Sequence, residues 1–301
     1  MLRKIISALL SLSIVLSFAA CKKVPSAANV STVQKFEPSS HRPEKPTPPE
    51  TVPFEETILV DNEVCTFKVT GIDADNRWGY TLKAYLENKT NLDLMFALDM
   101  VSVNGFMCDP FWASTVTAGM KANEEIGFSS SDFMRNGITD VTEIEFTLKV
   151  YDSENWSADH LIHDTYVLYP MGEEAVVSYT RTPIDREIML FDNENCTMIL
   201  TGFDSDSMWG YTVNVYLENK TDKELMFSLG DAAVNGFMCD PFWADSVAPG
   251  KRSNTSISWN SDDFESNGIT SVETLTLPIR VYDNNNWSAS DFVNETFSVA
   301  P

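Results

Sequence analysis

The sequence predicts an all-β protein made of two tandem β-sandwich domains. Apolar residues alternate along short segments, turn-forming residues separate those segments, and the whole pattern occurs twice. The stretch Val103–Ala113 recurs letter for letter as Val234–Ala244. The apolar share of 43% is sufficient for ordinary hydrophobic cores.

The N-terminus resembles an export signal. Arg3 and Lys4 precede a short apolar run from Ile5 to Phe18, which is too short for a membrane span. The run ends in Ala19-Ala20-Cys21, which resembles a bacterial lipobox although Phe18 stands where leucine is usual. We expect residues 1–20 to be a signal peptide and Cys21 to carry lipid. The alternative is ordinary cleavage after Ala20 with Cys21 as a free thiol.

Residues 21–53 are expected to form a proline-rich, disordered tether. Half of the chain's 14 prolines fall here, among Ser, Thr, Glu and Lys. Such a composition cannot bury enough apolar surface to fold, and it favours extended conformations. Together with a lipidated Cys21, this predicts a protein anchored at the outer face of the cytoplasmic membrane. A stable anchor needs two or three acyl chains rather than one.

The rest of the chain is a tandem duplication. Cysteines and tryptophans recur at one constant, domain-sized interval, as in Cys65 and Cys196 or Trp112 and Trp243. We expect the first repeat at residues 54–170, a linker or leading strand at 171–187, and the second repeat at 188–301. Two copies of one domain permit bivalent binding.

Each repeat shows short segments with a period of two. From Trp78 to Leu86, and again from Trp209 to Leu217, alternate residues are apolar, which predicts a strand with one buried face that includes the tryptophan. Further strands are expected at 66–72, 92–98, 125–129, 144–150 and 162–169. A helical turn after Ser131 should end at Gly137. Seven or eight short strands in each repeat fit an immunoglobulin-like sandwich.

The order of these motifs resembles a known family. A Trp-Gly-Tyr-Thr strand, a Tyr-Leu-Glu-Asn-Lys-Thr turn, a Val-Asn-Gly hairpin and a late Val-Tyr-Asp strand occur in both repeats. They resemble the immunoglobulin-like domains of unknown function in lipoproteins of Gram-positive, clostridia-like bacteria. The resemblance implies the fold and the surface location. The shared motifs include no catalytic one, so the resemblance leaves the activity open.

Each repeat contains two cysteines at matching positions: Cys65 with Cys108, and Cys196 with Cys239. An even count in an exported chain predicts one disulfide within each repeat. The alternative is buried thiols that act as small apolar groups. Two cysteines without a duplicated histidine are too few for a zinc site.

Acidic turns suggest a calcium alternative. Asp73 and Asp75 precede the first tryptophan strand, and Asp204 and Asp206 precede its duplicate. Ca²⁺ takes six to eight oxygen ligands, which acidic loops can supply. The competing interpretation is that these residues stabilise tight turns. We expect no cofactor, with calcium as the alternative.

Large aromatic residues outside the alternating runs are the candidate ligand-binding residues. In Asp109-Pro110-Phe111-Trp112 the proline should end the strand, so two rings follow in a loop. They form either a lid on the core or an exposed platform for a sugar or a partner. The full candidate set is Phe111, Trp112, Trp156, Phe242, Trp243 and Trp287.

Composition limits the function. A net charge of −23 disfavours nucleic-acid binding, because a phosphate backbone would be repelled. The chain has three histidines, and neither His160 nor His163 recurs in the second repeat, so no catalytic triad is indicated. We therefore expect a non-catalytic surface lipoprotein that binds a protein or a glycan at the cell envelope. The alternatives are a structural spacer and a hydrolase with an unrecognised pair of carboxylates.

Overall fold

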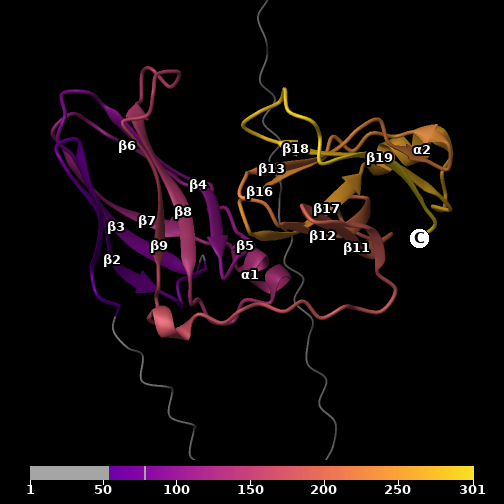
Figure 1. Cartoon of the computed structure of the whole chain (residues 1–301), viewed down its shortest axis with the longest axis horizontal. Coiled ribbons are helices and arrows are strands. Elements are labelled where there is room, and N and C mark those ends of the chain that lie inside the picture. The colour runs from indigo at the N-terminus through magenta and orange to yellow at the C-terminus, as the bar shows by residue number, and fades with distance from the viewer. Residues whose placement is uncertain (1–53, 78) are drawn as a thin grey trace, which may run out of the picture. The chain divides into compact units, whose positions relative to one another are not determined.

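The computed structural model describes residues 54–77 and 79–301. These residues belong to one compact unit, Thr51–Pro301, which contains two β-sandwiches of the immunoglobulin-like type (Figure 1). The fold is all-β apart from two short helices and one 3-10 turn. The predicted signal peptide, Cys21 and the predicted tether lie outside the described residues.

The first repeat pairs two antiparallel sheets. One sheet has the order β1-β2-β3-β7, and in the other β4 lies between β8 on one side and β5 and β6 on the other. Its strands are β1 (Thr57–Asp61), β2 (Cys65–Asp73), β3 (Thr81–Asn88), β4 (Leu94–Val103), β5 (Phe106–Met107), β6 (Ala113–Val116), β7 (Lys121–Gly127), β8 (Ile144–Asp152) and β9 (Ile162–Leu168).

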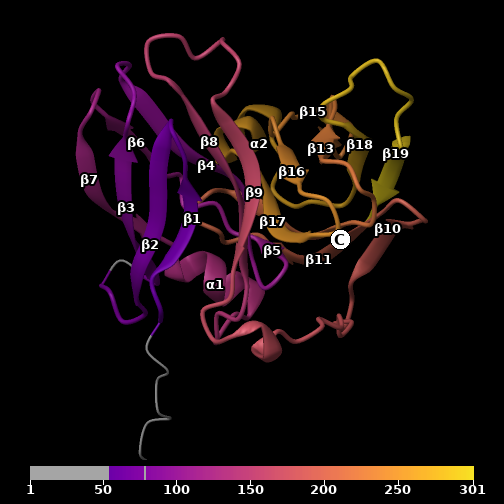
Figure 2. The same ribbon diagram turned by 60° about the vertical axis from the view of Figure 1, so that its left-hand side comes forward.

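The second repeat has the same arrangement. The β10-β11-β12-β17 sheet packs against a sheet in which β18 lies between β19 and the pair β13 and β14 (Figure 2). Its strands are β10 (Ile188–Asp192), β11 (Cys196–Asp204), β12 (Tyr211–Asn219), β13 (Leu225–Leu229), β14 (Ala233–Val234), β15 (Phe237–Met238), β16 (Ala244–Val247), β17 (Arg252–Trp259), β18 (Leu275–Asp283) and β19 (Val293–Val299).

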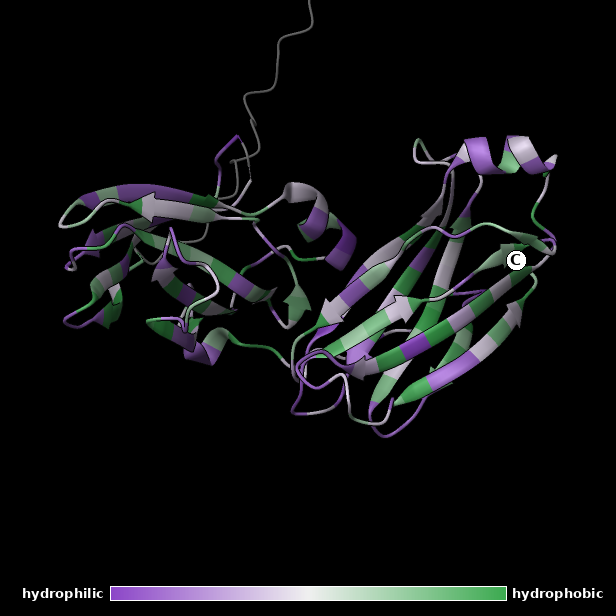
Figure 3. Cartoon of the chain, turned by 90° about the horizontal axis from the view of Figure 1, so that it is seen from above, coloured by the Kyte–Doolittle hydropathy of each residue, from purple (hydrophilic) through white to green (hydrophobic). Residues whose placement is uncertain are grey.

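Alternation along the strands builds both cores. Leu82, Ala84 and Leu86 of β3 are buried while Lys83 between them is exposed. Hydrophobic and hydrophilic bands follow one another along many strands in Figure 3. The predicted two-residue period is confirmed by this burial pattern, because successive side chains of a strand point to opposite faces.

The local turn predictions also hold. Val103 pairs with Phe106 across a tight hairpin whose central residues, Asn104 and Gly105, have φ of 51° and 80°. Positive φ at both positions matches the twist of a two-residue hairpin. Helix α1 (Ser130–Asn136) is capped by the Ser129 side chain and ends at a left-handed Gly137, and α2 (Ser261–Asn267) repeats this design.

The inner position predicted for the first tryptophan of the repeat is wrong in the second repeat. Trp209 is 72% exposed, because β12 begins only at Tyr211 and Trp209 lies in the turn before it. Trp259, which the sequence analysis did not single out, is fully buried instead and donates from Nε1 to the Cys239 carbonyl at 2.9 Å. Trp78 is not among the described residues.

Strand bounds differ modestly from the predicted ones. The β4 strand runs on to Val103, past the predicted end at Leu98, because the hairpin prolongs its pairing with β5 and β8. The β7 strand begins at Lys121 and ends at Gly127, so it starts before the predicted segment. The stretch 171–187 contains a 3-10 turn at Glu173–Ala175 and no strand.

One backbone contact joins the sheets of the two repeats. Strand β5 of the first repeat and β17 of the second are parallel neighbours at Phe106 and Arg252. The Arg252 amide donates to the Gly105 carbonyl at 2.9 Å. Nearby, the Lys251 ammonium pairs with the Glu145 carboxylate at 2.8 Å. Hence the two sandwiches share a nine-stranded sheet.

Candidate functional site

The segment Asp-Pro-Phe-Trp holds a phenylalanine ring out in solvent in both repeats. Phe111 is 92% exposed and Phe242 is 91% exposed. Their φ angles are 49° and 51°, in the left-handed region that large side chains rarely adopt. The Asp109 carboxylate accepts from the Phe111 amide at 2.7 Å, so the aspartate fixes this turn.

The neighbouring tryptophans, Trp112 and Trp243, cover the cores, which is the other role that the sequence allowed for these rings. Trp112 and Trp243 are half-buried and pack against the cores of their own repeats. The Trp112 ring meets the buried Phe67 ring edge-on at 6.3 Å between centroids. The predicted lid on the core therefore describes the tryptophan, and the exposed platform describes the phenylalanine.

Two further tryptophans lie in the loops that follow β8 and β18. Trp156 is 78% exposed and Trp287 is 71% exposed. Trp287 is held in place, because its Nε1 donates to the Asn284 carbonyl at 2.8 Å. Its ring also meets the Tyr282 ring edge-on at 6.0 Å. An exposed but fixed indole is a suitable surface for stacking.

Polar groups form a connected network beside Trp287. The Arg280 guanidinium lies 4.3 Å from the Tyr282 ring centre and donates twice to the Asp291 carboxylate, each time at 2.9 Å. Asn294 donates to the same carboxylate at 2.9 Å. The hydrogen bond from Arg280 lowers the pKa of Asp291. This surface therefore combines ring faces with fixed donors and acceptors.

In the first repeat histidines replace part of this network. His160 contacts Tyr151 at 5.2 Å and His163 at 5.1 Å between ring centroids. Burial, together with the nearby His163, lowers the pKa of His160. His160 and His163 stand where the second repeat has Asp291 and Asn294. The exposed tryptophan is thus shared between the repeats, while its polar surroundings differ.

The predicted disulfides are not formed. Cys65, Cys108, Cys196 and Cys239 are all buried free thiols. Cys65 pairs with Asn88 at the end of β3. Cys108 contacts Asn136 of α1. Helix α1 follows β7, and the end of β7 pairs with the start of β3. These places are about 20 Å apart along the strand, far beyond the reach of a disulfide. The cysteines act instead as small apolar residues, the alternative that the sequence allowed.

Geometry at the acidic turns matches turn chemistry. The Asp73 carboxylate accepts from the Asp75 amide at 3.3 Å, and the Asp204 carboxylate accepts from the Asp206 amide at 2.9 Å. Within residues 54–77 and 79–301, no three His, Cys, Asp or Glu side chains are grouped to hold a metal ion. Calcium binding stays a prediction, since Ca²⁺ also takes backbone and amide oxygens.

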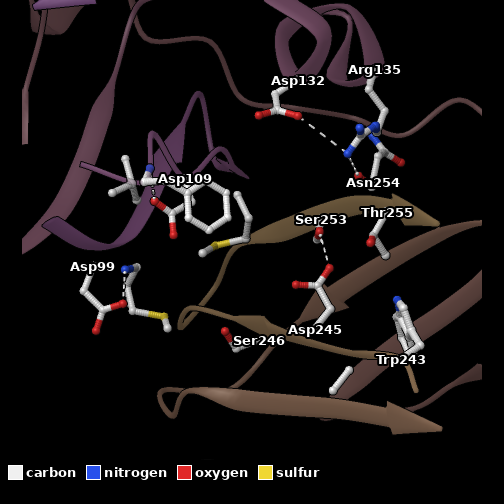
Figure 4. A pocket seen from close by; sticks show the side chains of 15 residues that line it. Asp99, Asp109, Asp132, Arg135, Trp243, Asp245, Ser246, Ser253, Asn254 and Thr255 are labelled. Carbon is white, nitrogen blue, oxygen red and sulfur yellow. Dashed lines mark hydrogen bonds and ion pairs between the residues drawn. The ribbon is translucent and has the colours of Figure 1, made fainter. Parts of the chain in front are cut away.

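A cavity of about 340 Å³ lies where the two repeats meet, and acidic side chains line it (Figure 4). Asp109, Asp132 and Asp245 each have a partner: the Phe111 amide, the Arg135 guanidinium at 3.6 Å, and the Ser253 hydroxyl at 3.0 Å. Burial raises the pKa of Asp245. Burial raises the pKa of Asp109 as well.

No helix in the described part of the chain is long and apolar enough to cross a membrane.

The fold and the exposed rings define the class: a duplicated immunoglobulin-like β-sandwich protein with aromatic side chains displayed at matching places.

Comparison with protein-family profiles finds no match, and comparison with curated proteins finds none either. Among solved structures, the chain is similar to the Salmonella enterica SafA pilin in complex with the SafB chaperone, with 13% identity and a TM-score of 0.21. This match covers 73% of this chain and 89% of that one. The YadV chaperone gives 12% identity, a TM-score of 0.20, and coverage of 73% and 92%.

The exo-chitosanase CsxA of Amycolatopsis orientalis gives 13% identity and a TM-score of 0.23. The match covers 77% of this chain and 26% of the enzyme chain. All three TM-scores are low.

Proposed function

We propose that this protein is a non-catalytic, exported surface lipoprotein whose two repeats bind a protein or a glycan of the cell envelope. The observation that supports binding is the matched exposure of four aromatic side chains: Phe111 and Phe242, Trp156 and Trp287. If the surface residues of the two repeats had changed independently, bulky rings would not be expected to remain exposed at the same places in both. Trp and other aromatics dominate binding energy where surfaces recognise partners.

The backbone at the phenylalanines supports the same proposal. A left-handed conformation costs a large L-residue about 1–2 kcal/mol, and it occurs here in both repeats. The exposed ring gains little buried area in return, because over nine-tenths of it faces solvent. A strained backbone that displays a ring in solvent is a reason to propose a function at that position.

The surroundings of Trp287 favour a glycan over a protein as its ligand. Asn285, Asn286 and Ser288 flank the ring in sequence, and the Arg280–Asp291 pair lies nearby. Ring faces stack on sugars while fixed polar groups bind hydroxyls, whereas protein hot spots are surrounded by contacts that exclude water. Lipid at Cys21 would place both repeats at the envelope, where two sites on one chain raise avidity.

Binding is tested by retention of the purified protein on cell-wall glycan, mucin and immobilised envelope protein. We expect replacement of both Trp156 and Trp287 by alanine to weaken glycan retention at least tenfold, the typical effect of losing a hot spot. Met134→Ala is the control, since Met134 is 81% exposed on α1 and away from the loops. Unchanged retention in the double variant would contradict the glycan proposal.

Failure of the wild-type protein to bind any of these ligands would favour the second candidate, a structural spacer. The ion pairs of Lys251 with Glu143 and Glu145 across the repeats support that candidate, because they oppose bending between the sandwiches. Lipid attachment is tested separately: a Cys21→Ala variant should lose incorporated fatty acid and leave the membrane fraction.

A further inference from the structure

Identical residues have different environments in the two repeats. Phe106 and Met107 of β5 match Phe237 and Met238 of β15, within the stretch that is repeated letter for letter. Phe106 is 3% exposed, whereas Phe237 is 47% exposed and Met238 is 65% exposed. Since the local sequence is the same, the difference arises from what covers each edge.

The second repeat and the segment before it cover β5. The Arg252 amide donates to the Gly105 carbonyl at 2.9 Å, so β17 continues the sheet beyond β5. The Tyr179 ring meets the Phe106 ring edge-on at 4.8 Å, and Met107 packs against the core of the second repeat. The β5 edge is therefore occupied within the chain.

The same pairing leaves two open edges at the outer ends of the described chain. Strand β15 lies at the edge of its sheet. Strand β7 also lies at the edge of its sheet, and it is the counterpart of β17 in the first repeat. One end thus displays a strand of the kind that accepts β17. The other end displays the counterpart of β17. An unpaired strand edge is a template for another chain.

We propose that the β15 edge of one chain binds the β7 edge of a second copy of this protein, head to tail. In this contact the Lys121 amide takes the place of the Arg252 amide and donates to the Gly236 carbonyl. Such an interface is heterologous, so it leaves one open edge on each end of the pair and permits growth.

The residues of the internal ion pair are replaced on both faces of the proposed contact. Inside the chain, Lys251 pairs with Glu143 and Glu145. The corresponding residues at the open edges are Met120 on one side and Thr274 and Thr276 on the other. Both members of this ion pair are replaced by uncharged residues, so docking would leave neither of them buried without a partner. Met120 is 58% exposed and is available for contact.

Another internal contact can be reproduced without any change. Asn254 of β17 donates to the Asn136 side chain of α1 at 3.0 Å. The corresponding residues at the open edges are Asn123 of β7 and Asn267 of α2, again a pair of asparagines.

Sedimentation velocity of the full chain, purified in detergent, tests the proposal up to about 1 mM, where weak association is detectable. We expect the sedimentation coefficient to rise with concentration, and more steeply at higher salt, because salt screens the repulsion between two chains of net charge −23. Met238→Glu and Met120→Glu should each abolish the concentration dependence. Met208→Glu is the matched control and should associate like the wild type, since Met208 is 88% exposed in a loop.

Mixing the two impaired variants separates a head-to-tail contact from other modes of association. The Met238→Glu chain keeps an intact β7 edge, and the Met120→Glu chain keeps an intact β15 edge. Their mixture should form a one-to-one dimer that grows no further. A wild-type chain that remains monomeric throughout, a Met238→Glu chain that still self-associates, or a mixture without dimer would each overturn the proposal.

Discussion

Asn88 and Asn219 occupy the same position in the two repeats, and each is 1% exposed. The Asn88 amide donates to the Leu92 and Val116 carbonyls at 2.7 and 2.8 Å, while its oxygen accepts from Thr90. One side chain thus closes the turn before β4 and ties it to the end of β6. The sequence showed the repeated Glu-Asn-Lys-Thr turn, but not that the asparagine faces inward.

We predict that Asn88→Ala lowers the free energy of unfolding by about 3 kcal/mol, because a buried and a part-buried carbonyl lose their donor. Equilibrium urea unfolding measures the change. Asn91→Ala is the control, since Asn91 is exposed three positions further along the chain, and it should change stability by less than about 0.5 kcal/mol. A similar loss in both variants would contradict the assigned role.

The cysteines lead to a second residue-scale prediction. Burial raises the pKa of the Cys65 and Cys196 thiols to about 11 and that of Cys108 to about 12. At pH 8 they should therefore be protonated and unreactive. In a Cys21→Ala background, a thiol reagent should detect no cysteine in the folded protein and all four after denaturation without reductant. Detection of no thiol after denaturation would show that the cysteines form disulfides.

At the scale of elements, turn geometry depends on particular glycines. Gly210 has φ of 89°, and a Cβ there would lie 2.0 Å from the Trp259 carbonyl oxygen. The turn before β12 can approach the end of β17 this closely only without a side chain. Gly250 also has a positive φ, 67°, but a Cβ there would meet nothing within 4 Å.

We predict that Gly210→Ala destabilises the second repeat by about 3 kcal/mol or more, since the backbone must shift to relieve the overlap. Gly250→Ala should cost about 1 kcal/mol, from the left-handed conformation alone. Thermal and urea unfolding compare the two. Equal losses would show that conformation, rather than the close approach to Trp259, decides the requirement for glycine.

Strand and turn predictions succeeded where short-range pattern determines structure. Period two placed β3 and β8, and the Asn-Gly pair placed the hairpin, because these signals lie within a few residues of each other. The same reasoning failed at Trp209, which continues the apolar alternation but precedes the strand. Pattern alone could not show that Trp259 fills the core instead, since that depends on contacts between distant segments.

At the scale of the whole molecule, the duplication was readable but the contact between the repeats was not. Repeated residues predict the same fold twice. They do not predict that Phe106 is covered while its identical counterpart Phe237 is open. Of the candidate binding residues, the sequence could group Phe111 with Trp112 but could not separate the exposed ring from the packed one, because a single left-handed residue decides it.

This difference in burial gives the last prediction. Phe106→Ala should lower the free energy of unfolding by about 3–4 kcal/mol, since it removes a buried ring that touches Tyr179 and leaves a cavity. Phe237→Ala should cost less than about 1.5 kcal/mol, because half of that ring already faces solvent. The comparison is internally controlled, since residue, strand type and flanking sequence are the same.

Urea unfolding at low micromolar concentration, where copies of the chain stay apart, measures both variants. The covered edge then accounts for the excess loss in Phe106→Ala, and Tyr179→Ala should reproduce part of it by uncovering the ring. Equal losses at Phe106 and Phe237 would mean that the second repeat adds nothing to the stability of the β5 edge. The contact between β5 and β17 would then be too weak to serve as the pattern for association between copies.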